Sequence, residues 1–151
     1  MPNGTHFVKV NLPIEYVWEF VSDMNRWAPL VPGYIKHDII DERQSTWHFK
    51  GDVGKIQKTI GLKVQIKEWL EPNSVTFDLT GIGENVKGDG YFLAERDGKE
   101  VTNITGYLQI AAGGMMAPVI NNVLKSIVPK TTIEFTDRIA SRLMAEHTVS
   151  R

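Results

Sequence analysis

Hydrophobic positions follow a two-residue period through the middle of this chain. Leu62, Val64 and Ile66 alternate with polar neighbours, and similar runs come before and after them. Alternation of this kind is typical of strands that bury one face. Turn-forming segments such as Glu71-Pro72-Asn73 and Asp97-Gly98-Lys99 separate the runs. The pattern therefore predicts six consecutive antiparallel strands.

A spacing of three and four residues replaces this alternation in the last part of the chain. Gly113-Gly114-Met115-Met116 precedes a stripe of residues that would share one helical face, namely Ile120, Val123, Ile127, Thr131, Phe135, Ile139 and Leu143. The spacing predicts one long helix lying against the sheet. Pro129 predicts a kink near Val128, because proline removes a helical hydrogen bond.

The N-terminal part predicts a strand and two short helices. His6, Val8 and Val10 share one strand face. After Pro13, a short amphipathic helix is indicated by Ile14, Val17, Trp18 and Val21. A second short helix would begin at Asp23 and stop at Pro29. The predicted order is thus β-α-α-β-β-β-β-β-β-α, an α+β fold with a seven-stranded antiparallel sheet around the long helix.

Glycines within the strand patterns predict the shape of the sheet. They stand at Gly51, Gly81, Gly88, Gly90 and Gly106. Inside a strand, glycine usually marks a bulge, a bend or a close approach of two backbones. We therefore expect a strongly curved sheet, with a pocket between the long helix and the strands that carry Phe77 and Leu79.

Composition narrows the class of protein. The chain has 151 residues, which suits a single domain over residues 1–151, and its formal net charge is -1. This balance gives no sign of nucleic-acid binding. The chain has no cysteine, which excludes disulfides and thiolate chemistry. No basic leader or membrane-length apolar run stands out, so we expect a cytoplasmic protein, with a peripheral position on the inner face of the membrane as an alternative.

The element order and several local motifs resemble the START-like helix-grip superfamily, also called SRPBCC, over nearly the whole chain. Within it, the chain is most similar to the CoxG family, which is named after carbon-monoxide dehydrogenase. That similarity rests on Pro13-x3-Val17-Trp18-x4-Asp23, Val31-Pro32-Gly33, the glycine-spaced strands and Gly113-Gly114-Met115-Met116. The resemblance implies a deep apolar cavity between sheet and helix, with its mouth near the short helices and the hairpin loops.

Function varies within the superfamily. Some members bind lipids, hormones or polyketides, and others catalyse cyclisation. The CoxG branch is associated with membrane recruitment or maturation of a molybdenum hydroxylase such as carbon-monoxide dehydrogenase. A fold does not choose among such roles.

Few residues offer catalytic chemistry. The spacing of the four histidines matches no metal-ligand pattern, so we expect no metal and no cofactor. No catalytic triad is indicated, because no serine stands at a strand-to-helix elbow. His6 and Lys58 are the two candidate polar groups of the cavity, although a structural histidine and a lysine reaching water are the alternative interpretations. His48 should lie on the outer face of the sheet.

Three hypotheses follow. The first is non-catalytic binding of a hydrophobic or amphipathic, lipid-like molecule. The second is an accessory protein for a membrane or a molybdenum hydroxylase, and the third is a polyketide cyclase-like enzyme. Met115 and Met116 would gather at the mouth, unless they simply fill gaps in the core. The expected cavity lining is Trp27, Val31, Trp47, Phe49, Leu62, Phe77, Leu79, Phe92, Ile110, Met115, Met116, Val119 and Val123.

Overall fold

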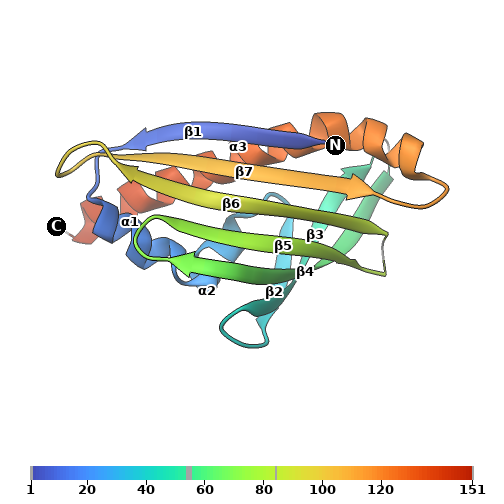
Figure 1. Cartoon of the computed structure of the whole chain (residues 1–151), viewed down its shortest axis with the longest axis horizontal. Coiled ribbons are helices and arrows are strands. Elements are labelled where there is room, and N and C mark those ends of the chain that lie inside the picture. Colours follow the sequence, from blue (N-terminus) through green and yellow to red (C-terminus); the bar gives the residue numbers. More distant parts are fainter. Residues whose placement is uncertain (1, 54–55, 84, 151) are drawn as a thin grey trace.

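The computed structural model describes residues 2–53, 56–83 and 85–150, of which 52, 53, 56–58 and 147–150 are described by their backbone alone. Seven strands, two α-helices and a 3-10 turn precede one long helix (Figure 1). The strands are β1 (Asn3–Val10), β2 (Tyr34–Ile39), β3 (Gln44–Val53), β4 (Ile56–Leu70), β5 (Ser74–Ile82), β6 (Val86–Arg96) and β7 (Thr102–Ala112). The helices are α1 (Ile14–Val21), α2 (Met24–Trp27), η1 (Ala28–Leu30) and α3 (Ala117–Ser150).

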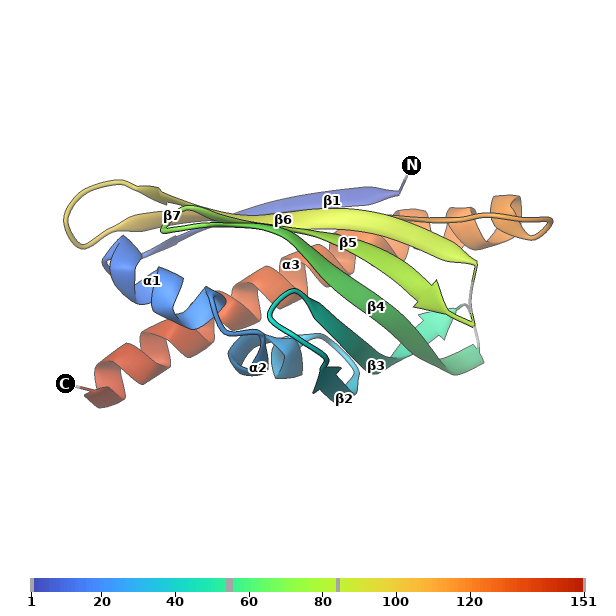
Figure 2. The same ribbon diagram turned by 60° about the horizontal axis from the view of Figure 1, so that its bottom comes forward.

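The strands form one antiparallel sheet in the order β1-β7-β6-β5-β4-β3-β2. Strands β2 to β7 pair with their neighbours in sequence, and β1 joins β7 at the far edge, with His6 opposite Gly106. Figure 2 shows that the sheet curves away from this edge and arches over the helices. The predicted element order and the curved, seven-stranded antiparallel sheet are confirmed.

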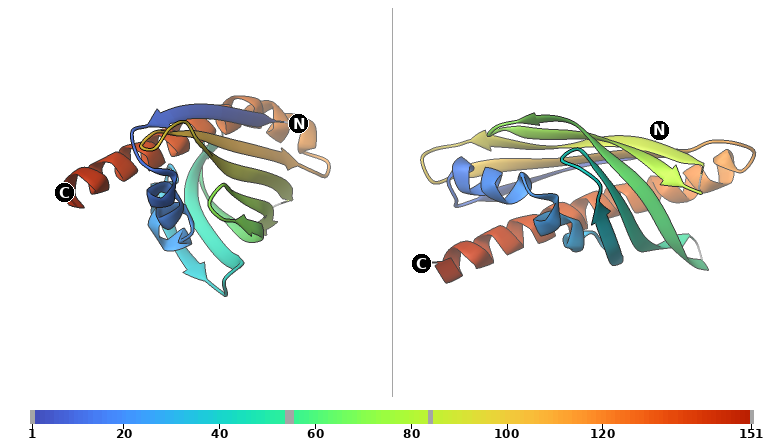
Figure 3. Two further views of the ribbon diagram at one scale, coloured as in Figure 1. Left: turned by 60° about the vertical axis from the view of Figure 1, so that its left-hand side comes forward. Right: turned by 90° about the horizontal axis from the view of Figure 1, so that it is seen from below.

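Helix α3 crosses the concave side of the sheet and contacts β1 and β7 (Figure 3). Glycine permits this close approach, since a Cβ atom at Gly106 would collide with the hydroxyl of Thr136. That hydroxyl donates to the Thr132 carbonyl at 2.7 Å, so the helix satisfies its own polar group where it meets the strand. The long helix was predicted correctly, and Pro129 lies inside one continuous helical segment.

The short helices close one end of the concave side. Asp23 caps α2 by accepting a hydrogen bond from the Asn25 backbone N–H at 3.0 Å. Pro29 follows within the 3-10 turn, where the α-helix has already ended. Arg26 ties α2 to α3 through an ion pair of 2.8 Å with Glu146. These contacts hold Trp27 and Val31 beneath the sheet, where both are buried.

Candidate functional site

A cavity of about 470 Å³ lies between the concave face of the sheet and the first half of α3. We call it the grip cavity. Its walls come from strands β3 to β7, from Trp27 and the loop after η1, and from α3 residues between Leu124 and Phe135. Small-molecule sites usually measure roughly 300–1,000 Å³, so this volume suits one ligand. The expected position between the helix and the strands of Phe77 and Leu79 is confirmed.

Aromatic rings line the end of the grip cavity near α2. The ring centroid of Trp27 lies 5.3 Å from that of Trp47, 6.4 Å from Phe77 and 6.2 Å from Phe135. Both indole N–H groups are already bonded, Trp27 to the Val21 carbonyl at 2.9 Å and Trp47 to the Ser45 hydroxyl at 2.8 Å. This wall therefore offers ring surface without a free indole donor, which suits an apolar part of a ligand.

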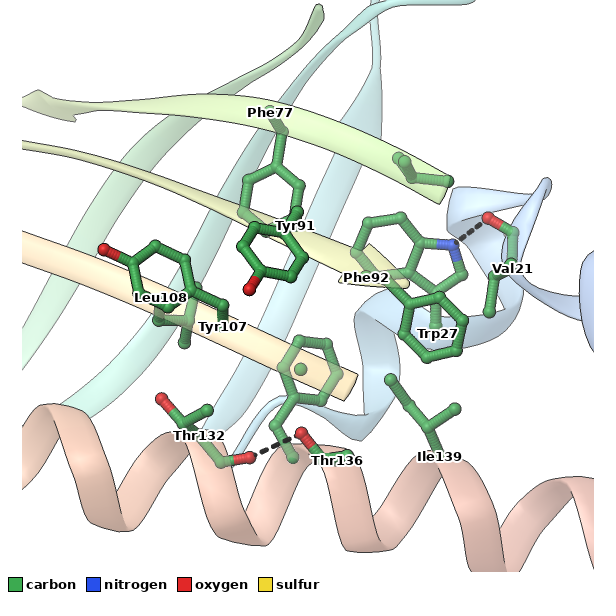
Figure 4. A pocket seen from close by; sticks show the side chains of 13 residues that line it. Val21, Trp27, Phe77, Tyr91, Phe92, Tyr107, Leu108, Thr132, Thr136 and Ile139 are labelled. Carbon is green, nitrogen blue, oxygen red and sulfur yellow. Dashed lines mark hydrogen bonds between the residues drawn. The ribbon is translucent and has the colours of Figure 1, made fainter. Parts of the chain in front are cut away.

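A second hollow of about 40 Å³ continues behind these rings. Figure 4 shows it between Trp27, Phe77 and Phe92 on one side and the α3 residues Thr132, Thr136 and Ile139 on the other. Glycine at position 90 makes room for the Phe77 ring, because a Cβ atom there would lie 2.7 Å from it. The volume is close to that of one water molecule, so this hollow is too small for a ligand.

Polar side chains reach the grip cavity from two elements. In the described lining they are Lys50 of β3 and Lys130, Thr131 and Glu134 of α3. Lys50 and Lys130 are exposed, whereas Glu134 and Thr131 are half-buried. The cavity thus combines an apolar interior with a charged edge at the solvent, an arrangement that fits an amphipathic molecule better than a purely polar one.

The structure brings together most of the residues proposed from the sequence. Eight of the thirteen line the grip cavity, namely Trp27, Val31, Trp47, Phe49, Leu62, Phe77, Leu79 and Ile110. Phe92 lines the small hollow behind them. Met115, Met116, Val119 and Val123 are absent from both linings.

The position expected for the two methionines needs correction. Met115 is 99% and Met116 58% exposed, and Val119 is 59% exposed. Helix α3 begins at Ala117 but first reaches the grip cavity at Leu124, because its opening turns extend past the end of β7 (Figure 1). Val123 lies one residue before that contact and is half-buried.

The candidate polar groups have different outcomes. His6 faces α3, where its Nε2 lies 2.9 Å from Asp137 Oδ1, and it is not part of the cavity lining. The backbone of Lys58 pairs with Gly51, but its side chain lies outside the described part of the structure. His48 packs over Gly61 on the outer face of the sheet and is half-buried. Within the described residues, no three histidine, aspartate or glutamate side chains come close enough to hold a metal ion.

Sequence reasoning missed several lining residues that follow its own patterns. Ile60 is in phase with Leu62, and Leu108 is in phase with Ile110. On α3, Leu124 stands four residues after Ile120 and so continues a helical row. Extending each pattern by one position would have found them.

One carboxyl group and one phenol group outside the grip cavity have a shifted pKa. A hydrogen bond from Arg96 lowers the pKa of the Glu15 carboxyl. Burial, followed by the nearby charge of Asp89, raises the pKa of the Tyr107 phenol, which borders the small hollow and is not part of the grip-cavity lining. These shifts belong to the surfaces of α1 and β7, so they add no acid or base to the grip cavity.

Solved structures with the same architecture identify the fold. A START superfamily protein from Mycobacterium smegmatis superposes with a TM-score of 0.76 at 14% identity, covering 95% of this chain and 97% of that one. The chain has a START-like fold. A protein-family model matches residues 1–146, so the chain belongs to that family. A search among curated protein sequences finds no significant match.

Two enzymes share the START-like fold. The Zhui aromatase/cyclase from Streptomyces sp. R1128 has a TM-score of 0.73 and 15% identity over 94% of this chain and 93% of that one. Norcoclaurine synthase from Thalictrum flavum, in complex with dopamine and hydroxybenzaldehyde, has a TM-score of 0.68 and 14% identity over 96% and 87%. At such identities the likeness concerns the fold.

Proposed function

We propose that this START-like protein binds a hydrophobic or amphipathic, lipid-like molecule in the grip cavity and does not transform it. The observation that carries the proposal is the cavity of about 470 Å³ with an apolar interior between α3 and the sheet. Each Å² of apolar ligand surface removed from water would contribute roughly 25 cal/mol to binding. The described lining contains no histidine or serine, the residues most used as base and nucleophile.

The charged edge of the grip cavity would determine the orientation of a bound ligand. Lys50, Lys130 and Glu134 lie where the cavity meets solvent, and none of them makes an ion pair with a described residue. A polar end group placed there keeps its hydration, while the chain or ring system contacts the aromatic wall around Trp27. A ligand with a polar group at the inner end would lose hydrogen bonds that the two bonded indoles cannot replace.

A neutral apolar probe tests this proposal. N-phenyl-1-naphthylamine fluoresces when it leaves water, and titration would give its affinity for the wild type. Leu79→Trp adds a ring to an inward position of β5 that lines the cavity. We expect this variant to bind the probe at least about tenfold more weakly, because the added volume occupies the space that the probe needs.

Phe7→Trp is the matched control. Phe7 lies on β1, is 73% exposed and does not line the cavity, so a tryptophan there should leave probe binding unchanged. Circular dichroism would show that both variants are folded. If Leu79→Trp is folded and binds the probe as tightly as wild type, the probe site is elsewhere and the proposed function fails.

Docking to a membrane or to a molybdenum hydroxylase is a second candidate function. Met115, Met116 and Val119 favour it, because they expose an apolar tip at the start of α3. A Met115→Ser/Met116→Ser double variant should lose most of its flotation with phospholipid vesicles and keep its probe affinity. No wild-type flotation would exclude the vesicle surface, and pull-down of a purified hydroxylase would then test the other partner.

A cyclase-type reaction is the third candidate, since two proteins with this fold are enzymes. His6→Gln and Lys58→Met address it directly. Under the binding proposal, neither wild type nor variant converts an aromatic polyketide or ester substrate. A wild-type turnover that one of these substitutions abolishes, with probe affinity and thermal midpoint intact, would replace binding by catalysis.

A further inference from the structure

A third hollow, of about 460 Å³, lies apart from the grip cavity and from the small hollow behind its aromatic rings. It is an open cleft between the α1–α2 corner, the β2–β3 hairpin and the end of β4. Figure 1 shows this hairpin projecting from the rest of the sheet. Trp18, Met24, Ile39, Asp41, Glu42 and Trp69 are among its lining residues. We call it the tryptophan cleft. No described residue lines both the cleft and the grip cavity.

Two half-buried tryptophans form one corner of the cleft. The rings of Trp18 and Trp69 stand at 88° with their centroids 6.4 Å apart. Within the described residues, neither indole N–H has a hydrogen-bond acceptor. Tryptophan is enriched at protein interfaces, because its ring contacts apolar groups while its N–H can donate a hydrogen bond.

Carboxylates also line the cleft. Asp23 caps α2, and Asp41 accepts hydrogen bonds from the backbone N–H groups of Arg43 and Gln44 at 2.8 Å. Glu42 makes no hydrogen bond or ion pair with a described residue. No lysine or arginine is among the described lining residues. Hydrogen bonds therefore hold Asp23 and Asp41 in place, whereas Glu42 is free to move, and none of the three has a basic partner in the described lining of the cleft.

Ile39 adds an exposed apolar side chain to the lining of the cleft, since it is 42% exposed. Apolar surface beside unneutralised carboxylates is complementary to a surface that presents apolar and basic groups side by side.

We propose that the tryptophan cleft docks a segment of a partner protein that carries a lysine or arginine next to an apolar side chain. The apolar side chain packs between Trp18, Trp69 and Ile39. The basic group lies against the tryptophan rings and pairs with Glu42 and Asp41. The free indole N–H groups donate to backbone carbonyls of the segment. An open cleft suits such a chain segment better than a small molecule, which needs an enclosing pocket.

Peptide display on the intact protein tests this proposal without knowledge of the partner. A random 12-residue library is selected on immobilised wild type in the presence of excess soluble Glu42→Lys protein. Peptides that survive should contain a lysine or arginine within two positions of an apolar residue. Absence of enrichment, or enrichment of sequences without basic residues, would overturn the proposal.

The strongest peptide is then synthesised and titrated. We expect Glu42→Lys to weaken its binding at least about tenfold, because the change replaces an attraction by a repulsion. Glu100→Lys is the matched control, since Glu100 is exposed in the β6–β7 loop and should bind within twofold of wild type. Equal affinity of wild type and Glu42→Lys would contradict the docking site.

Self-association is the other outcome to distinguish. Sedimentation velocity of wild type and Glu42→Lys would show whether a second copy of the chain occupies the cleft. A dimer of wild type that Glu42→Lys dissociates would replace the basic partner by the protein itself. The probe assay of the grip cavity uses separate residues, so the docking proposal and the binding proposal can fail independently.

Discussion

The grip cavity and the tryptophan cleft have nearly the same volume, about 470 and 460 Å³, and each holds a pair of tryptophans at a steep angle. Trp27 and Trp47 in the cavity are only 6% exposed, and each donates its indole hydrogen to an acceptor within the protein. Trp18 and Trp69 in the cleft are half-buried and have no such acceptor among the described residues.

Volume and aromatic content therefore do not distinguish the two hollows. The hydrogen bonding of the indole groups distinguishes them, because a bonded indole presents only ring surface whereas a free indole also presents an N–H donor. The charges follow the same division. The cavity has mixed charges at its edge, and the cleft has carboxylates without a basic side chain in its described lining. The first arrangement suits an apolar molecule, and the second suits a basic segment.

The largest expected effect is a difference in stability between variants of the two tryptophan pairs. Trp27→Ala should lower the free energy of unfolding by about 3–5 kcal/mol, because it removes a buried ring and leaves a cavity beside Trp47 and Phe77. Trp69→Ala should cost about 1–2 kcal/mol, since its ring is half exposed. Urea unfolding of both variants measures the difference. Equal losses would show that the two pairs have the same structural role.

Salt sharpens the comparison further. Binding of the neutral probe to the grip cavity should stay within about twofold between 20 and 500 mM NaCl, because no charge on the probe is screened. Binding of the selected basic peptide to the cleft should weaken by about five- to tenfold over the same range. Titrations in both buffers test this. A cleft affinity that does not change with salt would contradict the pairing of the peptide with Glu42 and Asp41.

The smallest expected effect concerns the anchoring of α1, the helix that carries Trp18. Arg96 donates to Glu15 Oε1 at 2.6 Å and holds the pKa of that carboxyl below its ordinary value of 4.5. The charged form thus favours the folded state, and this contribution is present above pH 4.5 and lost as the pH falls through the lower, folded pKa. Both groups are exposed, so the contribution is small.

Glu15→Gln isolates this contribution. The variant should have a slightly lower thermal midpoint than wild type at pH 7, and the two midpoints should converge as the pH is lowered to about 3. Scanning calorimetry at both values gives the comparison. A gap that persists or widens in acid would mean that Glu15 acts through its packing rather than through its charge.

The periodic parts of the chain could be predicted from its sequence. Alternation around Leu62 and Phe77 indicated both the strands and the face that borders the cavity, and the stripe from Ile120 to Leu143 indicated α3. The start of contact between α3 and the sheet could not be predicted in this way. The apolar residues Met115 and Val119 extend the same spacing, and only the end of β7 at Ala112 determines that they stay exposed.

The tryptophan cleft was beyond the reach of sequence patterns for a different reason. Its lining comes from three separate segments, and Trp18, Glu42 and Trp69 share no period. Even Trp18 fits the helical pattern of α1 as an ordinary apolar residue. The contacts of an indole N–H depend on the fold, so the distinction between a bonded and a free tryptophan has no counterpart in the sequence.

The most direct test of ligand binding is native mass spectrometry of the wild type purified from its own host, followed by organic extraction of the same sample. The account predicts a mass above that of the 151-residue chain and, in the extract, one hydrophobic or amphipathic molecule that Leu79→Trp protein no longer retains. Wild type that carries only its own mass and also fails to take up a neutral apolar probe would contradict the proposal that the grip cavity is a binding site.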